Sequence, residues 1–241
     1  FNVYGHLKNN RKFSRFIKLT ITDNFLVKEI LINKYEENNI KVIESGIDIN
    51  IFKPSIETSN RELGPFIIGF LGRLSPEKNP NYIIEIAKLL KEHTNIKFFI
   101  YGDGPMYNEI LNSITTNGLN RTVELKGFVN NISAFKDINL LFMPSHIEGR
   151  PFAAMESLSS GIPVLASTCG GIKELIKHNV NGLLFNLEDL ELVKNYIIDL
   201  SSNKIEYRKL SDNARKFAIK YLDSKRMNRE YRDTIHSILN Q

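Results

Sequence analysis

The sequence predicts an α/β fold with a Rossmann-like parallel sheet and helices on both of its faces. From residue 66 onward, short apolar runs alternate with longer amphipathic segments, which is the pattern of repeated strand–helix units. The charged residues and glycines that stand out in this part of the chain follow the ends of the apolar runs. In open parallel sheets, ligands bind beyond the carboxyl ends of the strands, so the same pattern predicts where a site should lie.

Six apolar runs are predicted to be the strands of this sheet. They cover residues 66–71, 96–101, 122–125, 138–143, 163–166 and 182–185. After the first of them, Asn79 is expected to cap a helix that has Pro80 at its first position. The apolar stripe of this helix consists of Ile83, Ile86, Ala87 and Leu90. Two helices with apolar side chains at helical spacing are predicted to close the chain, at residues 204–221 and 224–239.

A second, smaller strand–helix–strand passage is predicted at residues 18–43, ahead of the main sheet. It is followed by residues 54–65, which are rich in Ser, Thr, Asn and Glu and poor in apolar residues, as in a linker. We therefore place a domain boundary near residues 45–60. Phe1 stands where an initiator Met would stand, which suggests that an upstream segment has been removed.

The composition excludes several classes of protein. With 241 residues, of which 42% are hydrophobic and 24% charged, the chain has the composition of a soluble globular protein. Its single cysteine, Cys169, excludes an internal disulfide and a thiolate metal cage and favours a reducing compartment, so we expect a cytoplasmic protein. No apolar run approaches the roughly 18 residues of a membrane span. The net charge of +5 favours anionic partners without choosing among nucleic acid, acidic membranes and phosphorylated metabolites.

The loop after the first predicted strand carries two cations. Arg73 follows the strand and Gly72 directly, and Lys78 lies next to the N-terminus of the following helix. Backbone N–H groups at the helix start could join both side chains in binding one anion, and a phosphate or diphosphate would fit. The simpler interpretation is a solvated turn with an ion pair between Arg73 and Glu77.

The stretch YGDGP, residues 101–105, places Gly102 and Gly104 between a strand and a helix. It is an incomplete G-x-G-x-x-G pattern without the third glycine, and it is therefore weak evidence for a dinucleotide site. The favoured interpretation is a tight turn with a close approach of the backbone to another group. A nicotinamide-dependent oxidoreductase would need an acidic residue at a strand end about 20 residues further on, and Glu124 lies within a predicted strand.

The stretch SHIEGRPFAAMESLSSGIPV, residues 145–164, holds two carboxylates whose positions need an explanation. A helix is predicted to have Pro151 in its first turn, so its first N–H groups would lack intrahelical acceptors and point into the crevice. Glu156 lies further along this helix among apolar residues, where an ionised group needs a specific partner. A ribose diol offers two adjacent hydroxyls. The alternative is that Glu156 pairs with an arginine or the backbone and that Glu148 complements the helix dipole.

Taken together, these motifs resemble glycosyltransferase family 4, the retaining enzymes of the GT-B fold. The family's hallmark is a pair of glutamates separated by seven residues, here Glu148 and Glu156, followed by a G-x-P-V turn at residues 161–164. Further motifs of the family occur in order within residues 18–200, namely SGIDINIF, GRLSPEKN, YGDGP, LKGFV, CGGIKELI and NGLLF. The sequence departs from the usual pattern at Arg150 and Pro151, where Phe-Gly or Phe-Pro is commoner.

The resemblance implies a role for each matching residue. Arg73 and Lys78 would hold the donor diphosphate and stabilise negative charge on the leaving group. Glu156 would bind the nucleotide ribose, and Glu148 would face the transferred sugar. The backbone around the sugar and the phosphates would come from Gly72, Gly149, Arg150, Pro151 and Phe152. The loop that cradles the base would be formed by Gly127, Phe128 and Val129, and it would extend to Asn131.

The implied function is a retaining, metal-independent transfer of a hexose from a nucleoside diphosphate sugar, with a UDP-sugar as the first choice. The acceptor would be a glycan, a lipid or a small molecule. The resemblance implies no cofactor and no metal, and the chain contains no Asp-x-Asp. It makes residues 1–45 a remnant of the N-terminal acceptor domain, 46–65 the interdomain linker, 66–220 the donor-binding domain and 221–241 a helix that crosses back to the first domain. Such a chain should bind the donor and transfer the sugar poorly without the rest of the acceptor domain.

Other interpretations stay open, namely a non-catalytic module that binds nucleotide sugars, the oxidoreductase considered above and a sugar-nucleotide epimerase. The expected partners are a nucleotide sugar and, through the missing N-terminal domain, an acceptor glycan or lipid, whereas nucleic acid is not expected. A basic run is formed by Lys8, Arg11, Lys12, Arg15 and Lys18. It could hold the protein peripherally at the inner face of a membrane, and the simpler explanation is a solvated helix face.

Overall fold

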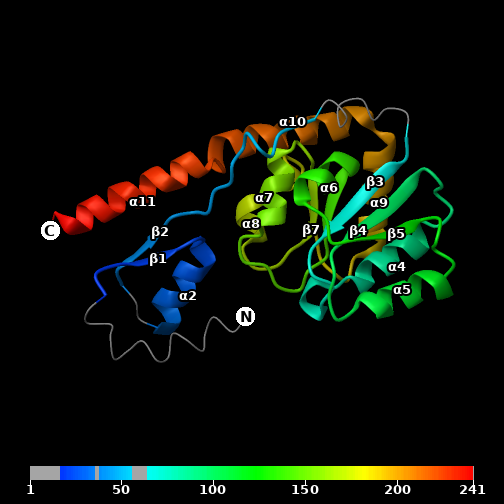
Figure 1. The fold of residues 1–241 in the computed structure, drawn as a ribbon, viewed down its shortest axis with the longest axis horizontal. Helices are drawn as coiled ribbons and strands as arrows, with labels where there is room; N and C mark the ends of the chain where they lie inside the picture. Colours follow the sequence, from blue (N-terminus) through cyan, green and yellow to red (C-terminus); the bar gives the residue numbers. More distant parts are fainter. Residues whose placement is uncertain (1–16, 36–37, 56–63, 241) are drawn as a thin grey trace. The chain divides into compact units, whose positions relative to one another are not determined.

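The computed structural model describes residues 17–35, 38–55 and 64–240, which form two compact units (Figure 1). The larger unit comprises residues 47–223 and contains the main sheet. The smaller unit comprises residues 1–46 and 224–241. The predicted α/β architecture is confirmed.

The larger unit is built on a six-stranded sheet in which all strands are parallel. In spatial order the strands are β5 (Val123–Gly127), β4 (Ile96–Tyr101), β3 (Phe66–Leu71), β6 (Leu140–Met143), β7 (Val164–Ser167) and β8 (Gly182–Phe185). This is the doubly wound order, in which the chain progresses in one direction from β3 to β5 and in the other from β6 to β8. The order reverses between β3 and β6, where Ile68 pairs with Leu140 and Gly69 with Leu141. The loops that follow these two strands should therefore border the ligand crevice.

Both faces of the sheet are covered by helices, and each face has its own apolar core. Alternation along β6 shows the division, since Leu140 and Phe142 belong to one core and Leu141 and Met143 to the other. The first core is covered by α4 (Asn81–Leu89), α5 (Tyr107–Thr116) and α9 (Leu190–Ser202). The second core contains residues of α6 (Asn131–Asp137), α7 (Phe152–Ser159), α8 (Ile172–Leu175) and α10 (Lys204–Tyr221).

Two helix starts differ from the prediction. Asn79 does not cap a helix, because it adopts the left-handed conformation (φ 52°, ψ 53°) and ends a short 3-10 helix, η4 (Pro76–Lys78). Asparagine tolerates this conformation better than most residues, so it suits the end of a turn as well as the start of a helix. Pro80 is then the cap of α4. Pro151 likewise precedes α7 as its cap and is not its first helical residue.

The smaller unit contains a two-stranded parallel sheet formed by β1 (Thr20–Thr22) and β2 (Ile40–Val42), which are joined by α2 (Phe25–Tyr35). The last helix, α11 (Ser224–Leu239), belongs to the same unit. Lys41 donates a hydrogen bond to the Thr234 hydroxyl on α11 (2.7 Å), which attaches that helix to β2. The assignment of this unit to the remnant of an acceptor domain stays a prediction.

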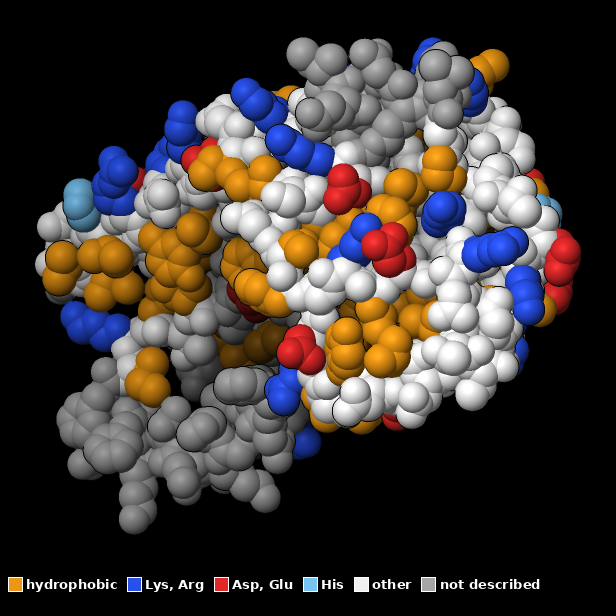
Figure 2. Space-filling view, turned by 45° about the vertical axis from the view of Figure 1, so that its right-hand side comes forward, with side chains coloured by type: hydrophobic (Ala, Val, Ile, Leu, Met, Phe, Trp, Pro, Cys, Tyr) orange, Lys and Arg blue, Asp and Glu red, His pale blue; other side chains and the backbone are white. Residues whose placement is uncertain are grey.

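None of the helices in the described part of the chain combines the length and the hydropathy that crossing a bilayer requires. Four residues of the basic run, Lys8, Arg11, Lys12 and Arg15, lie outside the described residues, whereas Lys18 is exposed. On the face shown in Figure 2, basic side chains are scattered and stand among acidic and apolar ones.

Arg215 on α10 ties the end of α7 to the first residues of the larger unit. Its Nη1 donates hydrogen bonds to the backbone oxygens of Ile49 (2.9 Å), Phe52 (3.0 Å) and Ser159 (2.8 Å). A cation at the C-terminal end of α7 satisfies carbonyls that have no partner within the helix and complements the helix dipole. Arg215 therefore fixes the helix on which Glu156 lies.

Replacement of Arg215 by alanine is expected to lower the free energy of unfolding by about 2–3 kcal/mol, because several carbonyls lose a charged donor together. Urea denaturation followed by circular dichroism measures this change. Lys216→Ala is the matched control, since Lys216 is the exposed next residue of the same helix, and its effect should stay within about 0.5 kcal/mol. Equal stability of the two variants would show that the Arg215 hydrogen bonds do not hold α7 in place.

Candidate functional site

A small cavity lies at the carboxyl ends of β3 and β6, where the strand order reverses. Its volume is about 150 Å³. Residues of the loops after both strands and of the start of α7 line it, namely Phe70, Leu71, Gly72, Lys78, Met143, Ser145, Glu148, Pro151, Phe152 and Ala153. The cavity thus brings together five residues that the sequence predicts to be functional: Gly72, Lys78, Glu148, Pro151 and Phe152.

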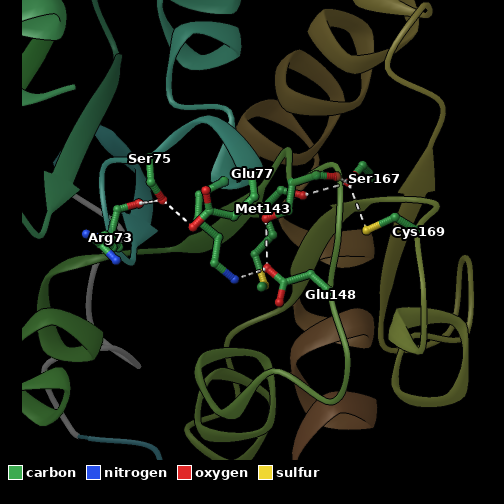
Figure 3. A network of polar contacts seen from close by, with 9 residues as sticks. Arg73, Ser75, Glu77, Met143, Glu148, Ser167 and Cys169 are labelled. Carbon is green, nitrogen blue, oxygen red and sulfur yellow. Dashed lines mark hydrogen bonds and ion pairs between the residues drawn. The ribbon is translucent and has the colours of Figure 1, made fainter. Parts of the chain in front are cut away.

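An ion pair between Lys78 and Glu148 forms one wall of this cavity. Lys78 Nζ lies 2.8 Å from Glu148 Oε1, and the Ser145 hydroxyl donates a hydrogen bond of 2.7 Å to the same oxygen (Figure 3). The Glu148 side chain is 6% exposed and the Lys78 side chain 29%. A carboxylate at this depth needs a charged partner, and Lys78 supplies it. Both residues are predicted from the sequence to lie at the site, but their ion pair is not.

The backbone of Glu148 is held by the turn after β7. Gly171 donates a backbone hydrogen bond to the carbonyl oxygen of Glu148 (3.1 Å). Gly170 adopts φ +49°, and a Cβ there would lie 1.8 Å from the same oxygen. On the other side, the His146 N–H donates to the backbone oxygen of Glu77 (2.9 Å), which joins the loop after β6 to η4. These contacts fix Glu148 relative to Lys78.

The two glycines of YGDGP allow the loop after β3 to pack against the loop after β4. A Cβ on Gly102 would lie 1.9 Å from the backbone oxygen of Gly72, and one on Gly104 would lie 2.4 Å from that of Leu74. Gly72 and Leu74 in turn donate backbone hydrogen bonds to Tyr101 (3.1 Å) and Asp103 (2.9 Å). The predicted tight turn with a close backbone approach is confirmed, and the group approached is the loop that carries Arg73.

Arg73 is not among the residues that line the cavity. In Figure 3 its guanidinium lies on the far side of Ser75 from Glu148. The Ser75 hydroxyl donates a hydrogen bond of 2.6 Å to Glu77 Oε1, and this bond lowers the pKa of Glu77, with smaller contributions from the charges of Arg73 and Lys78. The structure therefore brings Lys78 into the lining of the cavity and leaves Arg73 out of it.

The N-terminus of α7 opens at the cavity. Pro151 is the cap residue, and the first backbone bond within the helix runs from Met155 N–H to the Pro151 oxygen. The N–H groups of the first turn therefore have no acceptor within the helix, which gives this end a partial positive charge. No atom lies within 4 Å of the position that a Cβ on Gly149 would take, so the space in front of this loop is open. Arg150 is buried, with 7% of its surface exposed.

Glu156, one turn into α7, is half-buried and accepts a hydrogen bond of 2.6 Å from Asn131 Nδ2 at its Oε2 oxygen. Burial raises the pKa of Glu156, and the bond from Asn131 opposes that rise. The partner that the sequence requires for this carboxylate is thus an asparagine amide. Motif order places Asn131 in the base loop and does not reveal this contact, although the two adjacent asparagines at the start of α6 were a visible signal.

The loop predicted to cradle the base leads from β5 into α6. Gly127 adopts φ +67°, a conformation that favours glycine, and its carbonyl accepts a hydrogen bond of 2.8 Å from the Gly102 N–H. Val129 packs against the second core. Phe128 is 89% exposed, so a large aromatic face is available on this loop. Such a face can stack on a planar ring.

The model of the family described as glycosyl transferases group 1 matches residues 52–217, more than half of the chain. The chain belongs to this family. It is 31% identical over 191 residues to UDP-Gal:alpha-D-GlcNAc-diphosphoundecaprenol alpha-1,3-galactosyltransferase of Escherichia coli, which covers 74% of this chain and 49% of that protein. It is 27% identical over 188 residues to poly(ribitol-phosphate) alpha-N-acetylglucosaminyltransferase of Staphylococcus aureus, which covers 77% of this chain and 37% of that protein.

Solved structures of other proteins share the fold of this chain. HepE from Anabaena, solved in complex with UDP, superposes with a TM-score of 0.88 at 24% identity, covering 98% of this chain and 68% of that chain. The likeness confirms the predicted GT-B type of fold for the described part of the chain. The chain spans about half of the length of its E. coli relative and a smaller share of the S. aureus one.

Proposed function

We propose that this member of the glycosyl transferases group 1 binds a nucleoside diphosphate sugar at the cavity between β3 and β6, with a UDP-sugar as the donor. The observation that carries the proposal is that Lys78 and the N-terminal turn of α7 line the same cavity at the switch point of the sheet. Both attract a diphosphate. The E. coli relative's name specifies UDP-Gal, and HepE was solved with UDP and with UDP-glucose.

In this proposal the chemistry is the transfer of the sugar with retention of its anomeric configuration. Cleavage of the bond to the diphosphate builds negative charge on the leaving group. Lys78 and the first N–H groups of α7 are preorganised to stabilise that charge, and Arg73 is assigned a supporting role beside them. Glu148 orients the sugar and acts electrostatically, without forming a covalent bond.

The ion pair between Lys78 and Glu148 means that the donor competes with a carboxylate for the lysine. A diphosphate that enters the cavity brings more negative charge than Glu148 and can accept hydrogen bonds from Lys78 in its place. Glu148 is then available to accept a hydrogen bond from a sugar hydroxyl. The pair keeps a buried carboxylate neutralised until the donor arrives.

The acceptor is proposed to be a glycan or a lipid-linked glycan, bound by the rest of the full-length protein. The isolated chain would then bind the donor and transfer the sugar poorly. A non-catalytic nucleotide-sugar module remains the second candidate, and transfer by the full-length protein distinguishes the two, since a module would bind the donor and release no UDP.

Calorimetric titration with UDP-, GDP- and ADP-sugars and with NAD tests the donor site. We expect saturable binding of a sugar nucleotide, strongest for a UDP-sugar, and no binding of NAD. Strong binding of NAD with none of any sugar nucleotide would overturn the proposed function in favour of an oxidoreductase.

Substitutions of the two glutamates should differ in which ligands they bind more weakly. Glu156→Ala is expected to weaken the binding of both UDP and a UDP-sugar by a factor of about 10, because both ligands carry the ribose. Glu148→Gln should weaken the UDP-sugar and leave UDP unchanged or bound more tightly, because it releases Lys78 from its carboxylate partner. Titration of both variants with both ligands checks this. An equal loss of both ligands in both variants contradicts the division of roles.

A further inference from the structure

We infer that Asn131 is a positioning residue for ribose recognition, because its side-chain amide holds Glu156 in the orientation that accepts the two ribose hydroxyls. The inference rests on the proposed function and names a residue that acts through Glu156. It starts from the hydrogen bond of 2.6 Å between Asn131 Nδ2 and Glu156 Oε2, which joins α6 to α7 across 25 residues of sequence.

Asn131 is itself held in place. It is the first residue of α6, and the preceding Asn130 caps that helix by accepting a hydrogen bond of 2.9 Å from the Ile132 N–H. Further along α6, Ala134 and Phe135 are buried in the second core. The amide of Asn131 is therefore presented to Glu156 from a capped and packed helix, so a glutamate side chain with several rotatable bonds gains a fixed point.

The contact with Asn131 also favours the form of Glu156 that accepts the most hydrogen bonds. Burial raises the pKa of Glu156, and the neutral acid could accept from fewer donors because one oxygen would carry a proton. A hydrogen bond donated by Asn131 favours the charged form. Asn131 thus supports both the orientation and the charge of the carboxylate.

A carboxylate has enough hydrogen-bond acceptor sites for both Asn131 and a ribose. A carboxylate has two oxygens with about four lone-pair directions, and the amide occupies one direction at Oε2. The 2′- and 3′-hydroxyls of a ribose can donate to the remaining directions. In the opposite case Asn131 would only fill the site until the ribose displaces it, and its removal would then strengthen binding.

The isosteric variant Asn131→Asp gives the sharpest test, because it keeps the shape of the side chain and replaces the donor by a second carboxylate. Asn131→Ala removes the donor without adding charge. Asn112→Ala is the matched control, since Asn112 is an exposed asparagine on α5. Each variant is titrated calorimetrically with UDP and with 2′,3′-dideoxy-UDP, and thermal melting checks that each is folded.

We expect Asn131→Ala to weaken UDP binding by a factor of about 10 and Asn131→Asp by a factor of about 30 or more, since like charges repel at this distance. Binding of 2′,3′-dideoxy-UDP should change by less than about twofold in both variants, because that ligand makes no hydrogen bond to Glu156. The double variant Asn131→Ala/Glu156→Ala should bind UDP no more weakly than the single variant Glu156→Ala, because Asn131 acts through Glu156.

Three outcomes would overturn the inference and leave the proposed function standing. Unchanged or tighter UDP binding in Asn131→Ala would make Asn131 a competitor of the ribose. If the folded variants lost the same affinity for UDP and for 2′,3′-dideoxy-UDP, Asn131 would only maintain the structure of the loop. If the wild-type protein bound the two ligands with equal affinity, the ribose hydroxyls would not be bound by Glu156. Failure of the wild-type protein to bind UDP at all would instead refute the proposed function, and the inference with it.

Discussion

Replacing Lys78 by alanine is expected to lower the affinity for UDP by a factor of about 100, which corresponds to about 2.7 kcal/mol. Lys78 is the one cation among the residues known to line the cavity in the described part of the chain, and its neighbours there are mostly apolar. A diphosphate that loses this partner keeps only the N-terminus of α7 and weaker contacts nearby. Isothermal titration calorimetry with UDP measures the loss.

Lys88→Ala is the control for a general change of charge, because Lys88 is a partly exposed lysine of α4 that pairs with Glu85. It should bind UDP as the wild-type protein does. Lys78→Ala also leaves Glu148 buried without its ion partner, so its thermal stability has to be measured in parallel. In the background of Glu148→Gln a neutral amide replaces that carboxylate. If the substitution Lys78→Ala still lowers UDP affinity there, the effect is due to the missing cation. Affinity equal to that of Lys88→Ala would refute the role of Lys78.

Replacing Gly170 by alanine is expected to lower the free energy of unfolding by about 3 kcal/mol or more. Gly170 adopts φ +49°, and a Cβ there would lie 1.8 Å from the carbonyl oxygen of Glu148, so the backbone of one loop has to move. Since that carbonyl belongs to the residue paired with Lys78, the variant should also lose affinity for a UDP-sugar. Urea denaturation and calorimetry measure the two effects.

Gly64→Ala serves as the comparison for stability, because no atom lies within 4 Å of a Cβ at Gly64. It should unfold at nearly the wild-type urea concentration. If Gly170→Ala were as stable as Gly64→Ala, the loops could not be packed as closely as the structure has them, and the fixed position of Glu148 would be wrong.

The strands of the main sheet could be predicted from sequence because each is a short, buried apolar run. The runs at residues 66–71, 96–101 and 182–185 match β3, β4 and β8 to the residue. Helix starts were harder, since Asn79 suits both a helix cap and the left-handed end of η4. The residues around Asn79 do not decide between these two uses. The preceding 3-10 helix, η4, places Asn79 at its left-handed end.

The sequence indicates which residues form the site but not which of them contact one another. Motif order indicated Lys78 and Glu148, but their ion pair spans 70 residues and exists because β3 and β6 are neighbours in the sheet. The bond between Asn131 and Glu156 likewise depends on how α6 and α7 pack. The expected convergence of Arg73 with Lys78 depended on a loop conformation that the sequence does not define, and the role of Arg73 stays a prediction.

A crystal structure of the protein with bound UDP tests the central claim most directly. In the structure described above, Lys78 Nζ lies 2.8 Å from Glu148 Oε1. With UDP present, we predict that Nζ lies within hydrogen-bond distance of a phosphate oxygen at the start of α7 and that Glu156 accepts hydrogen bonds from the ribose. UDP bound elsewhere, with the pair between Lys78 and Glu148 unchanged, would contradict the account.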